Sequence, residues 1–242
     1  MSGTDLLLHG FAGTGRSWDA VIQAAADPQW RPNAPDLPGH GDAGEAAAGG
    51  IPGLAAALAA EYRPIGTLAG YSMGGRIALQ MALDHPGSTD RLVLVSMSPG
   101  IEDPGERAER SRADHELAAR FEQMAPEEVA ELWLAGPLFA ADPPDVQERA
   151  REQILASEPA GLAGALREYG PGEMEPLWDR LPELALPVTV VVGERDVRYR
   201  EIAERMAALV PGAEVVVVAG AGHALPREAP EELAELLAPV AG

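Results

Sequence analysis

Cysteine is absent from the sequence, and so is lysine. Without cysteine the chain can form no disulfide, no thiolate metal site and no cysteine nucleophile, so nucleophilic chemistry would fall to serine. Arginine supplies all 18 basic side chains against 38 acidic ones, which gives a formal net charge of -20. Nucleic acids and anionic membranes select basic surfaces. The charge therefore argues against both as partners and favours a free enzyme acting on a small molecule.

Long apolar runs are also missing, because none reaches the roughly 18 residues needed to span a bilayer. The first residues, Met1 to Asp5, carry no basic stretch leading into a signal-type apolar region. We therefore expect a cytoplasmic protein without membrane insertion, a monomer or weak homo-oligomer. A chain of 242 residues fits one domain with a single hydrophobic core.

Short apolar segments alternate with helical patterns along both ends of the chain. Runs of this kind predict buried strands of a parallel sheet that is covered on both faces. Since strands and helices alternate, we expect an α/β fold with a mostly parallel sheet of about six strands flanked by helices. The expected strands lie at 6–8, 33–37, 67–70, 91–96, 188–192 and 215–218.

The pattern changes between residues 100 and 178. This span is charged, helical in pattern and free of strand signals, and its prolines include those at 126, 137, 143, 144, 159, 171 and 176. We interpret residues 100–178 as an inserted helical lid, with residues 1–99 and 179–242 forming the core.

A possible nucleophile follows the strand at 67–70. The sequence Gly70-Tyr71-Ser72-Met73-Gly74 matches G-x-S-x-G, in which small residues on both sides of the serine allow a strained turn to expose its hydroxyl. A strand precedes the motif and a helical pattern follows it, as this mechanism requires. The alternative is a glycine-rich turn with a bystander serine.

Serine is a weak nucleophile, so it needs a base and a carboxylate that orients that base. In this arrangement the acid and then the histidine follow the serine in the chain, each after a strand. Asp196 and His223 occupy such places, after the strands at 188–192 and 215–218. Glu194 competes with Asp196 for the role of the acid. The other histidines, His9, His40, His85 and His115, compete with His223, but His9 belongs to the loop after the first strand, His85 ends a helical pattern and His115 lies in the span 100–178.

An oxyanion hole requires two backbone N–H groups directed at a developing negative charge. We expect Met73, the residue after the nucleophile, to supply one of them. Phe11 would supply the other from the loop after the first strand, where His9-Gly10 precedes it. No cluster of histidines and carboxylates has metal-ligand spacing, so we expect neither a metal nor a cofactor.

These motifs resemble the α/β-hydrolase superfamily over nearly the whole chain, and most closely the 2-succinyl-6-hydroxy-2,4-cyclohexadiene-1-carboxylate synthases of menaquinone biosynthesis. The lid segments are the specific part of the resemblance, because many esterases and C–C hydrolases share the core motifs. The matching segments are Leu8-His9-Gly10-Phe11, Asp36-Leu37-Pro38-Gly39-His40-Gly41, Gly70 to Arg76, Ser98-Pro99-Gly100-Ile101, Glu106-Arg107 with Arg110, Trp133, Pro137-Leu138-Phe139, Gly161-Leu162-Ala163, Gly193 to Asp196 and Gly220 to His223.

The resemblance implies a lyase that eliminates pyruvate from a multiply anionic cyclohexene, with the Ser-His-Asp triad acting as a base. It implies that Arg76 and Arg110 hold carboxylates, since an arginine fork meets a carboxylate with two parallel hydrogen bonds. Other substrate-binding residues implied in the same way are His9, Tyr71, Trp133 and Arg198. The alternative for Arg76 and Arg110 is that both are solvated helix arginines.

One segment departs from the family. Where the synthases carry another lid arginine, this chain has Ile154-Leu155-Ala156-Ser157, so either Arg149 or Arg151 substitutes for it or this chain lacks it. Two further functions stay open: a carboxylic ester or C–C bond hydrolase with the same triad, and a ligand-binding relative without catalysis. Arginines converging on the serine would favour the lyase, whereas an apolar lid pocket would favour the hydrolase.

Overall fold

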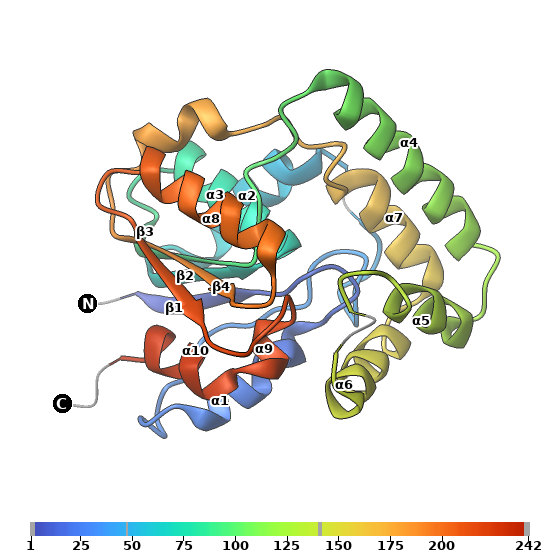
Figure 1. Ribbon diagram of the computed structural model, residues 1–242, viewed down its shortest axis with the longest axis horizontal. Helices are drawn as coiled ribbons and strands as arrows, with labels where there is room; N and C mark the ends of the chain where they lie inside the picture. The colour runs from blue at the N-terminus through green and yellow to red at the C-terminus, as the bar shows by residue number, and fades with distance from the viewer. Residues whose placement is uncertain (1–2, 47, 140–141, 240–242) are drawn as a thin grey trace.

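The computed structural model describes residues 3–46, 48–139 and 142–239. Within them, five strands form one sheet whose neighbours follow chain order, and every neighbouring pair is parallel (Figure 1). The predicted α/β fold with a parallel sheet is therefore confirmed. The strands are β1 (Thr4–Leu8), β2 (Ile65–Tyr71), β3 (Thr89–Val95), β4 (Val188–Gly193) and β5 (Glu214–Val218).

The sheet has five strands instead of the expected six because the segment at 33–37 makes only an isolated bridge to β1. Asn33 accepts a hydrogen bond from the Leu7 N–H and donates one to the Asp5 carbonyl, both at 2.8 Å. Prolines at 32 and 35 flank this residue. Proline has no N–H to donate, so the ladder cannot extend in either direction.

Helices cover both faces of the sheet (Figure 1). Side chains of a strand alternate between its faces, and in β3 Leu92 and Leu94 belong to one buried cluster while Val93 and Val95 belong to another. The first cluster packs under α2 (Gly50–Tyr62), α3 (Met73–Asp84) and α8 (Val197–Leu209). The second packs against the other face, under η1 (Gly15–Trp18), α1 (Asp19–Ala24), α9 (Leu225–Glu228) and α10 (Pro230–Leu237).

In the described part of the chain, four α-helices lie between β3 and β4, and each begins at a proline. Proline suits the first helical position, where the missing N–H would be unpaired and the fixed φ is already helical. Asp103 also caps the first of them by accepting a hydrogen bond from the Glu106 N–H at 2.8 Å. The helices are α4 (Pro104–Phe121), α5 (Pro126–Leu134), α6 (Pro144–Leu155) and α7 (Pro159–Tyr169).

These four helices share a small core of their own. Phe121, Val129, Ile154 and Leu162, one from each helix, are buried together. Residues 100–178 contain helices and no strand in the part that the structure describes, in agreement with the sequence pattern. The division into a core and a lid with those boundaries stays a prediction.

The two ends of the inserted segment meet. The Leu177 N–H donates to the Pro99 carbonyl at 2.8 Å, and the Trp178 indole donates to the Gly100 carbonyl at 2.9 Å. Gly100 has a φ of +114°, and a Cβ there would lie 2.9 Å from Pro176 Cα, so only glycine fits. The chain therefore leaves the sheet and returns to it at one place.

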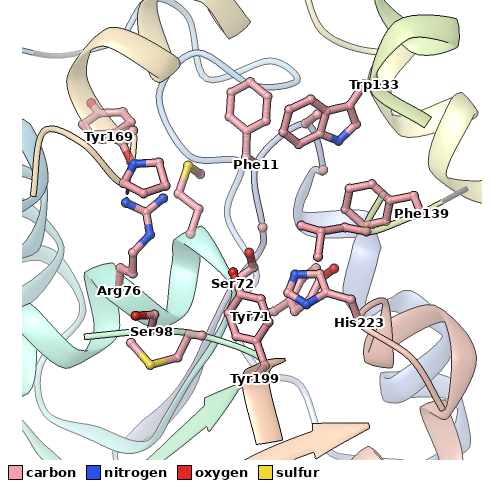
Figure 2. A pocket seen from close by; sticks show the side chains of 18 of the residues that line it. Phe11, Tyr71, Ser72, Arg76, Ser98, Trp133, Phe139, Tyr169, Tyr199 and His223 are labelled. Carbon is pink, nitrogen blue, oxygen red and sulfur yellow. Dashed lines mark hydrogen bonds between the residues drawn. The ribbon is translucent and has the colours of Figure 1, made fainter. Parts of the chain in front are cut away.

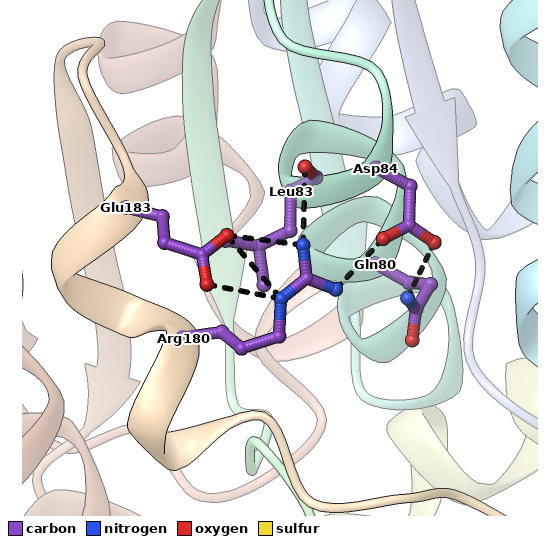
Figure 3. A network of polar contacts seen from close by, with 5 residues as sticks. All are labelled: Gln80, Leu83, Asp84, Arg180 and Glu183. Carbon is purple, nitrogen blue, oxygen red and sulfur yellow. Dashed lines mark hydrogen bonds and ion pairs between the residues drawn. The ribbon is translucent and has the colours of Figure 1, made fainter.

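A polar network then anchors η2 (Trp178–Glu183) to the end of α3 (Figure 3). Arg180 donates to Asp84 at 2.7 Å and to the Leu83 carbonyl at 3.3 Å, and it pairs with Glu183. Burial raises the pKa of Asp84, but hydrogen bonds from Arg180 and Gln80 outweigh it, so the net pKa is lowered. Because α3 begins immediately after Ser72, the network secures the far end of that helix.

None of the helices in the described part of the chain combines the length and apolarity that a membrane span requires.

Candidate active site

Ser72 lies in a sharp turn between β2 and α3. Its φ is +51°, a left-handed conformation that is costly for any residue with a side chain. The turn leaves no room beside it, because a Cβ at Gly70 would lie 2.3 Å from the Gly74 carbonyl oxygen, and one at Gly74 would lie 2.2 Å from the Leu8 carbonyl oxygen. The geometry is that of the nucleophile elbow expected from G-x-S-x-G.

The loop after β1 approaches this turn closely. A Cβ at Gly10 would lie 2.8 Å from the Tyr71 ring and 3.4 Å from Ser72 Cβ. Phe11 follows Gly10, and Met73 is the first residue of α3, so both residues proposed for an oxyanion hole line the cavity beside Ser72. The role of their N–H groups stays a prediction.

His223 and Asp196 form a buried pair. His223 Nδ1 lies 2.6 Å from Asp196 Oδ2, and because the carboxylate accepts, the ring nitrogen is the donor. Asp196 follows β4 and His223 follows β5, at neighbouring strand ends of the sheet. Glu194, the competing acid, is exposed and accepts instead from the Gly220 N–H at 2.9 Å. Asp196 is therefore the acid in contact with the histidine.

The loop that carries His223 is held by Glu228, a residue that the sequence did not single out. Its side chain is 4% exposed. One carboxylate oxygen accepts from the Gly222 N–H at 2.9 Å, the other accepts from the Ala224 N–H at 3.0 Å, and Arg195 forms an ion pair with it. Glu228 thus bonds to the residues on both sides of His223.

Ser72 and His223 face a cavity of about 420 Å³. Figure 2 shows the two side chains next to each other, with Arg76 on one side of Ser72 and Phe139 on the other. The strand ends and the loop at Gly10 supply part of the wall, and the inserted helices with their connecting loops supply Arg110, Trp133 and others. This cavity brings together residues that lie far apart in the sequence.

Aromatic rings form a continuous row over part of the cavity. Phe11 contacts Trp133 with ring centroids 4.7 Å apart, Trp133 contacts Phe139 at 6.0 Å, and Phe139 contacts His223 at 5.9 Å. Tyr199 packs on His223 at 4.6 Å and Tyr71 packs on it at 5.6 Å. His223 is thus surrounded by rings that restrict its orientation.

Four arginines line the same cavity: Arg76, Arg110, Arg198 and Arg227. Arg76 is buried and donates to the Tyr169 carbonyl at 2.7 Å. Burial, and to a smaller extent the charge of Arg110, lower the pKa of Arg76 to about 10, which leaves it charged near neutral pH. Arg110 pairs with the buried Asp114 at 2.8 Å. Neither residue is a freely solvated helix arginine.

The structure brings Tyr71, Trp133 and Arg198 to the cavity as expected, but it places His9 elsewhere. His9 is fully buried, contacts the Gly10 carbonyl through Nδ1, and accepts from the Leu37 N–H at 2.8 Å through Nε2. Burial lowers its pKa to about 4, so the ring is neutral. His9 therefore joins two loops behind the cavity instead of reaching a substrate.

The lid arginines considered as substitutes do not reach the site either. Arg149 pairs with Asp145 at 3.0 Å and lines a second cavity of about 250 Å³ between α6 and the η1–α1 region. Arg151 lines neither of these two cavities.

The sequence analysis missed two pocket residues, Tyr199 and Arg227. Tyr199 lies three residues after Asp196 and Arg227 four residues after His223. Helical spacing after each expected triad residue was the signal available, because residues one turn along a helix share a face. Among the described residues, no group of three or more His, Asp or Glu side chains is arranged to hold a metal ion.

Residues 6–236 match the model of the alpha/beta hydrolase family. The chain belongs to this family. Among its relatives is the 2-succinyl-6-hydroxy-2,4-cyclohexadiene-1-carboxylate synthase of Enterobacter sp. (strain 638), which is 32% identical over 97% of this chain and 90% of the relative. The synthase of Escherichia coli O1:K1 is 30% identical over 97% of this chain and 92% of the relative. The resemblance expected from the motifs is thereby confirmed.

Solved structures agree with this family placement. MenH from S. aureus is 31% identical, with a TM-score of 0.89 over 98% of this chain and 92% of that chain. A thermophilic esterase from Thermogutta terrifontis, solved with malate bound, is 29% identical, with a TM-score of 0.82 over 97% of this chain and 89% of that chain. This α/β-hydrolase-family chain thus resembles both a synthase and an esterase.

Proposed function

We propose that this chain is a 2-succinyl-6-hydroxy-2,4-cyclohexadiene-1-carboxylate synthase, a lyase that eliminates pyruvate from a succinyl-cyclohexene polycarboxylate. The observation that carries the proposal is the presence of four arginines in the cavity that contains Ser72 and His223. Cations inside a protein whose net charge is -20 are suited to an anionic substrate. The full-length similarity to the synthases supports the same function.

In this mechanism Ser72, His223 and Asp196 act together as a base. Asp196 holds His223 through Nδ1, so that Nε2 can take the proton from the Ser72 hydroxyl. The Ser72 oxygen then removes a proton from a substrate carbon, the electron pair of that C–H bond forms a C=C bond, and the C–O bond to the three-carbon group breaks. The departing enolpyruvate takes up a proton and becomes pyruvate.

The remaining residues bind the substrate and stabilise charge. The N–H groups of Phe11 and Met73 form the oxyanion hole for the negative charge that develops on a substrate oxygen. Arg76 and Arg110 hold substrate carboxylates, with Arg198 contributing at the rim, and Tyr71 and Trp133 line the pocket. Residues 100–178 form the lid over the core of residues 1–99 and 179–242. The enzyme acts on this small molecule in the cytoplasm, as a monomer or weak homo-oligomer.

The test is pyruvate release from the cyclohexene substrate, followed with lactate dehydrogenase and NADH, beside hydrolysis of p-nitrophenyl acetate. We expect pyruvate release to be abolished by Ser72→Ala and unaffected by EDTA, because the triad and the oxyanion hole supply both the base and the electrostatic stabilisation. Rapid ester hydrolysis without pyruvate release would favour the second candidate, an ester hydrolase. The row of aromatic rings in the cavity and the similarity to the esterase support this candidate.

A further inference from the structure

Arg227 differs from Arg76 and Arg110 in the same cavity because its guanidinium forms no hydrogen bond or ion pair with any described residue. Arg110 is paired with Asp114, and the Arg76 guanidinium is bonded to the Tyr169 carbonyl. The Arg227 guanidinium forms no ion pair with any described residue, and its Nε is buried without a hydrogen-bond partner. It is also the one residue that lines both cavities described above.

A second unpaired donor lies near it. The Tyr71 hydroxyl is buried, lines the same cavity and has no hydrogen-bond partner in the described structure. The Tyr71 ring packs on His223 with centroids 5.6 Å apart, Arg227 follows His223 by four residues, and Tyr71 and Arg227 line the same cavity. Buried donors are almost always paired in native proteins, so two unpaired donors beside one cavity indicate an acceptor that the protein itself does not supply.

The acidic side chains in this neighbourhood do not fill that role. Glu228 is occupied by the N–H groups of Gly222 and Ala224 and by Arg195. Asp142 is near enough for Arg227 and His223 to lower its pKa, yet burial keeps that pKa raised to about 6, and Asp142 forms no ion pair with Arg227. A guanidinium and a phenol that both donate are matched by a ligand carboxylate.

Arg227 lies in a different part of the cavity from the pair Arg76 and Arg110. Arg110 lowers the pKa of Arg76, so these two arginines form one positive region. Figure 2 places Arg76 on one side of Ser72, and His223 on the other. Arg227 lies on α9, the short helix that follows the His223 loop, four residues after His223. Positive charge is thus available on both sides of the serine.

We propose that Arg227 and the Tyr71 hydroxyl form a second carboxylate-binding subsite, so that the cavity selects dicarboxylates and polycarboxylates whose acid groups lie on both sides of Ser72. This inference rests on the proposed anionic substrate and specifies how that substrate is recognised. A carboxylate at this subsite receives charge-assisted hydrogen bonds from Arg227 and a further one from Tyr71.

The experiment measures the binding of simple acids by isothermal titration calorimetry, independently of turnover. The probes are succinate, glutarate and adipate, with butyrate as the monocarboxylate reference. We expect wild type to prefer at least one dicarboxylate over butyrate, and Arg227→Gln to lose that preference through a roughly tenfold to hundredfold weaker dicarboxylate affinity. Arg227→Lys should retain part of it, because the charge remains while the planar fork is lost.

Arg151→Gln is the matched control, since it removes one positive charge from the inserted helices without touching either cavity. Its dicarboxylate affinity should equal that of wild type. Tyr71→Phe should weaken the affinity less than Arg227→Gln, and the double variant should be little weaker than Arg227→Gln alone, because both groups hold one carboxylate. Circular dichroism establishes that each variant is folded.

The subsite would be overturned if folded Arg227→Gln preferred dicarboxylates over butyrate as strongly as wild type does. It would also be overturned if wild type showed no such preference. The result is separable from the proposed function. Pyruvate release that Arg227→Gln leaves unchanged would refute the subsite and retain the lyase. Dicarboxylate selectivity that depends on Arg227, in a protein that releases no pyruvate, would retain the subsite and refute the lyase.

Discussion

The strand ends of the sheet and the inserted helices contribute to one cavity in different ways. At the strand ends the backbone decides the geometry: Ser72 has a positive φ, and Gly70 and Gly74 have no space for a side chain. In the inserted helices the backbone is ordinary, and the contribution depends on which side chains point inward, such as Arg110 and Trp133. The first region should therefore fix the reaction, and the second the substrate.

The strongest test of this difference is at the strand ends. Ser72→Ala and His223→Ala should each lower kcat by roughly a thousandfold or more, and the double variant should be little worse, because triad members act as a unit. Asp196→Asn should also be severely impaired, since an amide favours the wrong imidazole tautomer. Steady-state kinetics of pyruvate release measures all four. Strictly additive losses, or a near-normal Asp196→Asn beside an inactive Glu194→Gln, would contradict this assignment.

Arg110 tests the inserted helices. Arg110→Ala should lower kcat/KM for the anionic substrate by roughly tenfold to a hundredfold and leave p-nitrophenyl acetate hydrolysis almost unchanged, because only the charged substrate uses the guanidinium. Arg110→Lys should recover part of the loss.

Arg110 also neutralises the buried Asp114, so its removal could act through the fold. The variant Arg110→Ala/Asp114→Asn removes the unpaired carboxylate and serves as the control. Equal losses for the neutral and the anionic substrate in both variants would show that Arg110 supports the helices and does not bind the ligand.

Glu228, which holds the loop that carries His223, provides a further test in the core. Glu228→Gln should lower kcat about tenfold with little change in KM, because an amide has one acceptor oxygen for two N–H donors and places its NH₂ group against one of them. The pH profile of kcat should shift with the altered environment of His223. Arg195→Gln removes only the half-exposed ion pair and should have a smaller effect. A fall in melting temperature without any change in kcat or the profile would assign Glu228 a purely structural role.

The smallest expected effect concerns Asp142, just before α6. Its pKa is raised to about 6, mainly by burial and then by the charge of Glu228. Above this pH the carboxylate is ionised and repels an anionic substrate near His223; as the pH falls through 6 the charge is lost and binding should tighten a few-fold. The measurement is the Kd of the anionic substrate in the Ser72→Ala background. The variant Ser72→Ala/Asp142→Asn should bind it at pH 7 as tightly as Ser72→Ala does at pH 5. If Kd changed with pH in the same way in both proteins, Asp142 would not be the group that weakens substrate binding.

The same difference between the two regions determines what could be predicted from the sequence. Ser72, Asp196 and His223 were predicted because strand, turn and helix patterns fix the places of these residues. A strand was predicted at 33–37, but the prolines beside Asn33 limit this segment to an isolated bridge. His9 was expected to contact the substrate, but both of its ring nitrogens form hydrogen bonds, one with the Gly10 carbonyl and one with the Leu37 N–H. Tyr199 and Arg227 were not predicted, although each lies three or four residues after an expected triad residue, a spacing that brings side chains to one face of a helix.

Because the Leu177 N–H donates to the Pro99 carbonyl, we expect residues 100–176 to be replaceable as one segment. The chain entropy lost on closing a loop rises only slowly with the length of the loop. The five-stranded core can therefore accommodate a helical segment of another length or composition at this point without a change in its own connections. Substrate range in such a protein can diversify by replacing one continuous stretch of sequence, while the catalytic turn and the histidine loop remain in place.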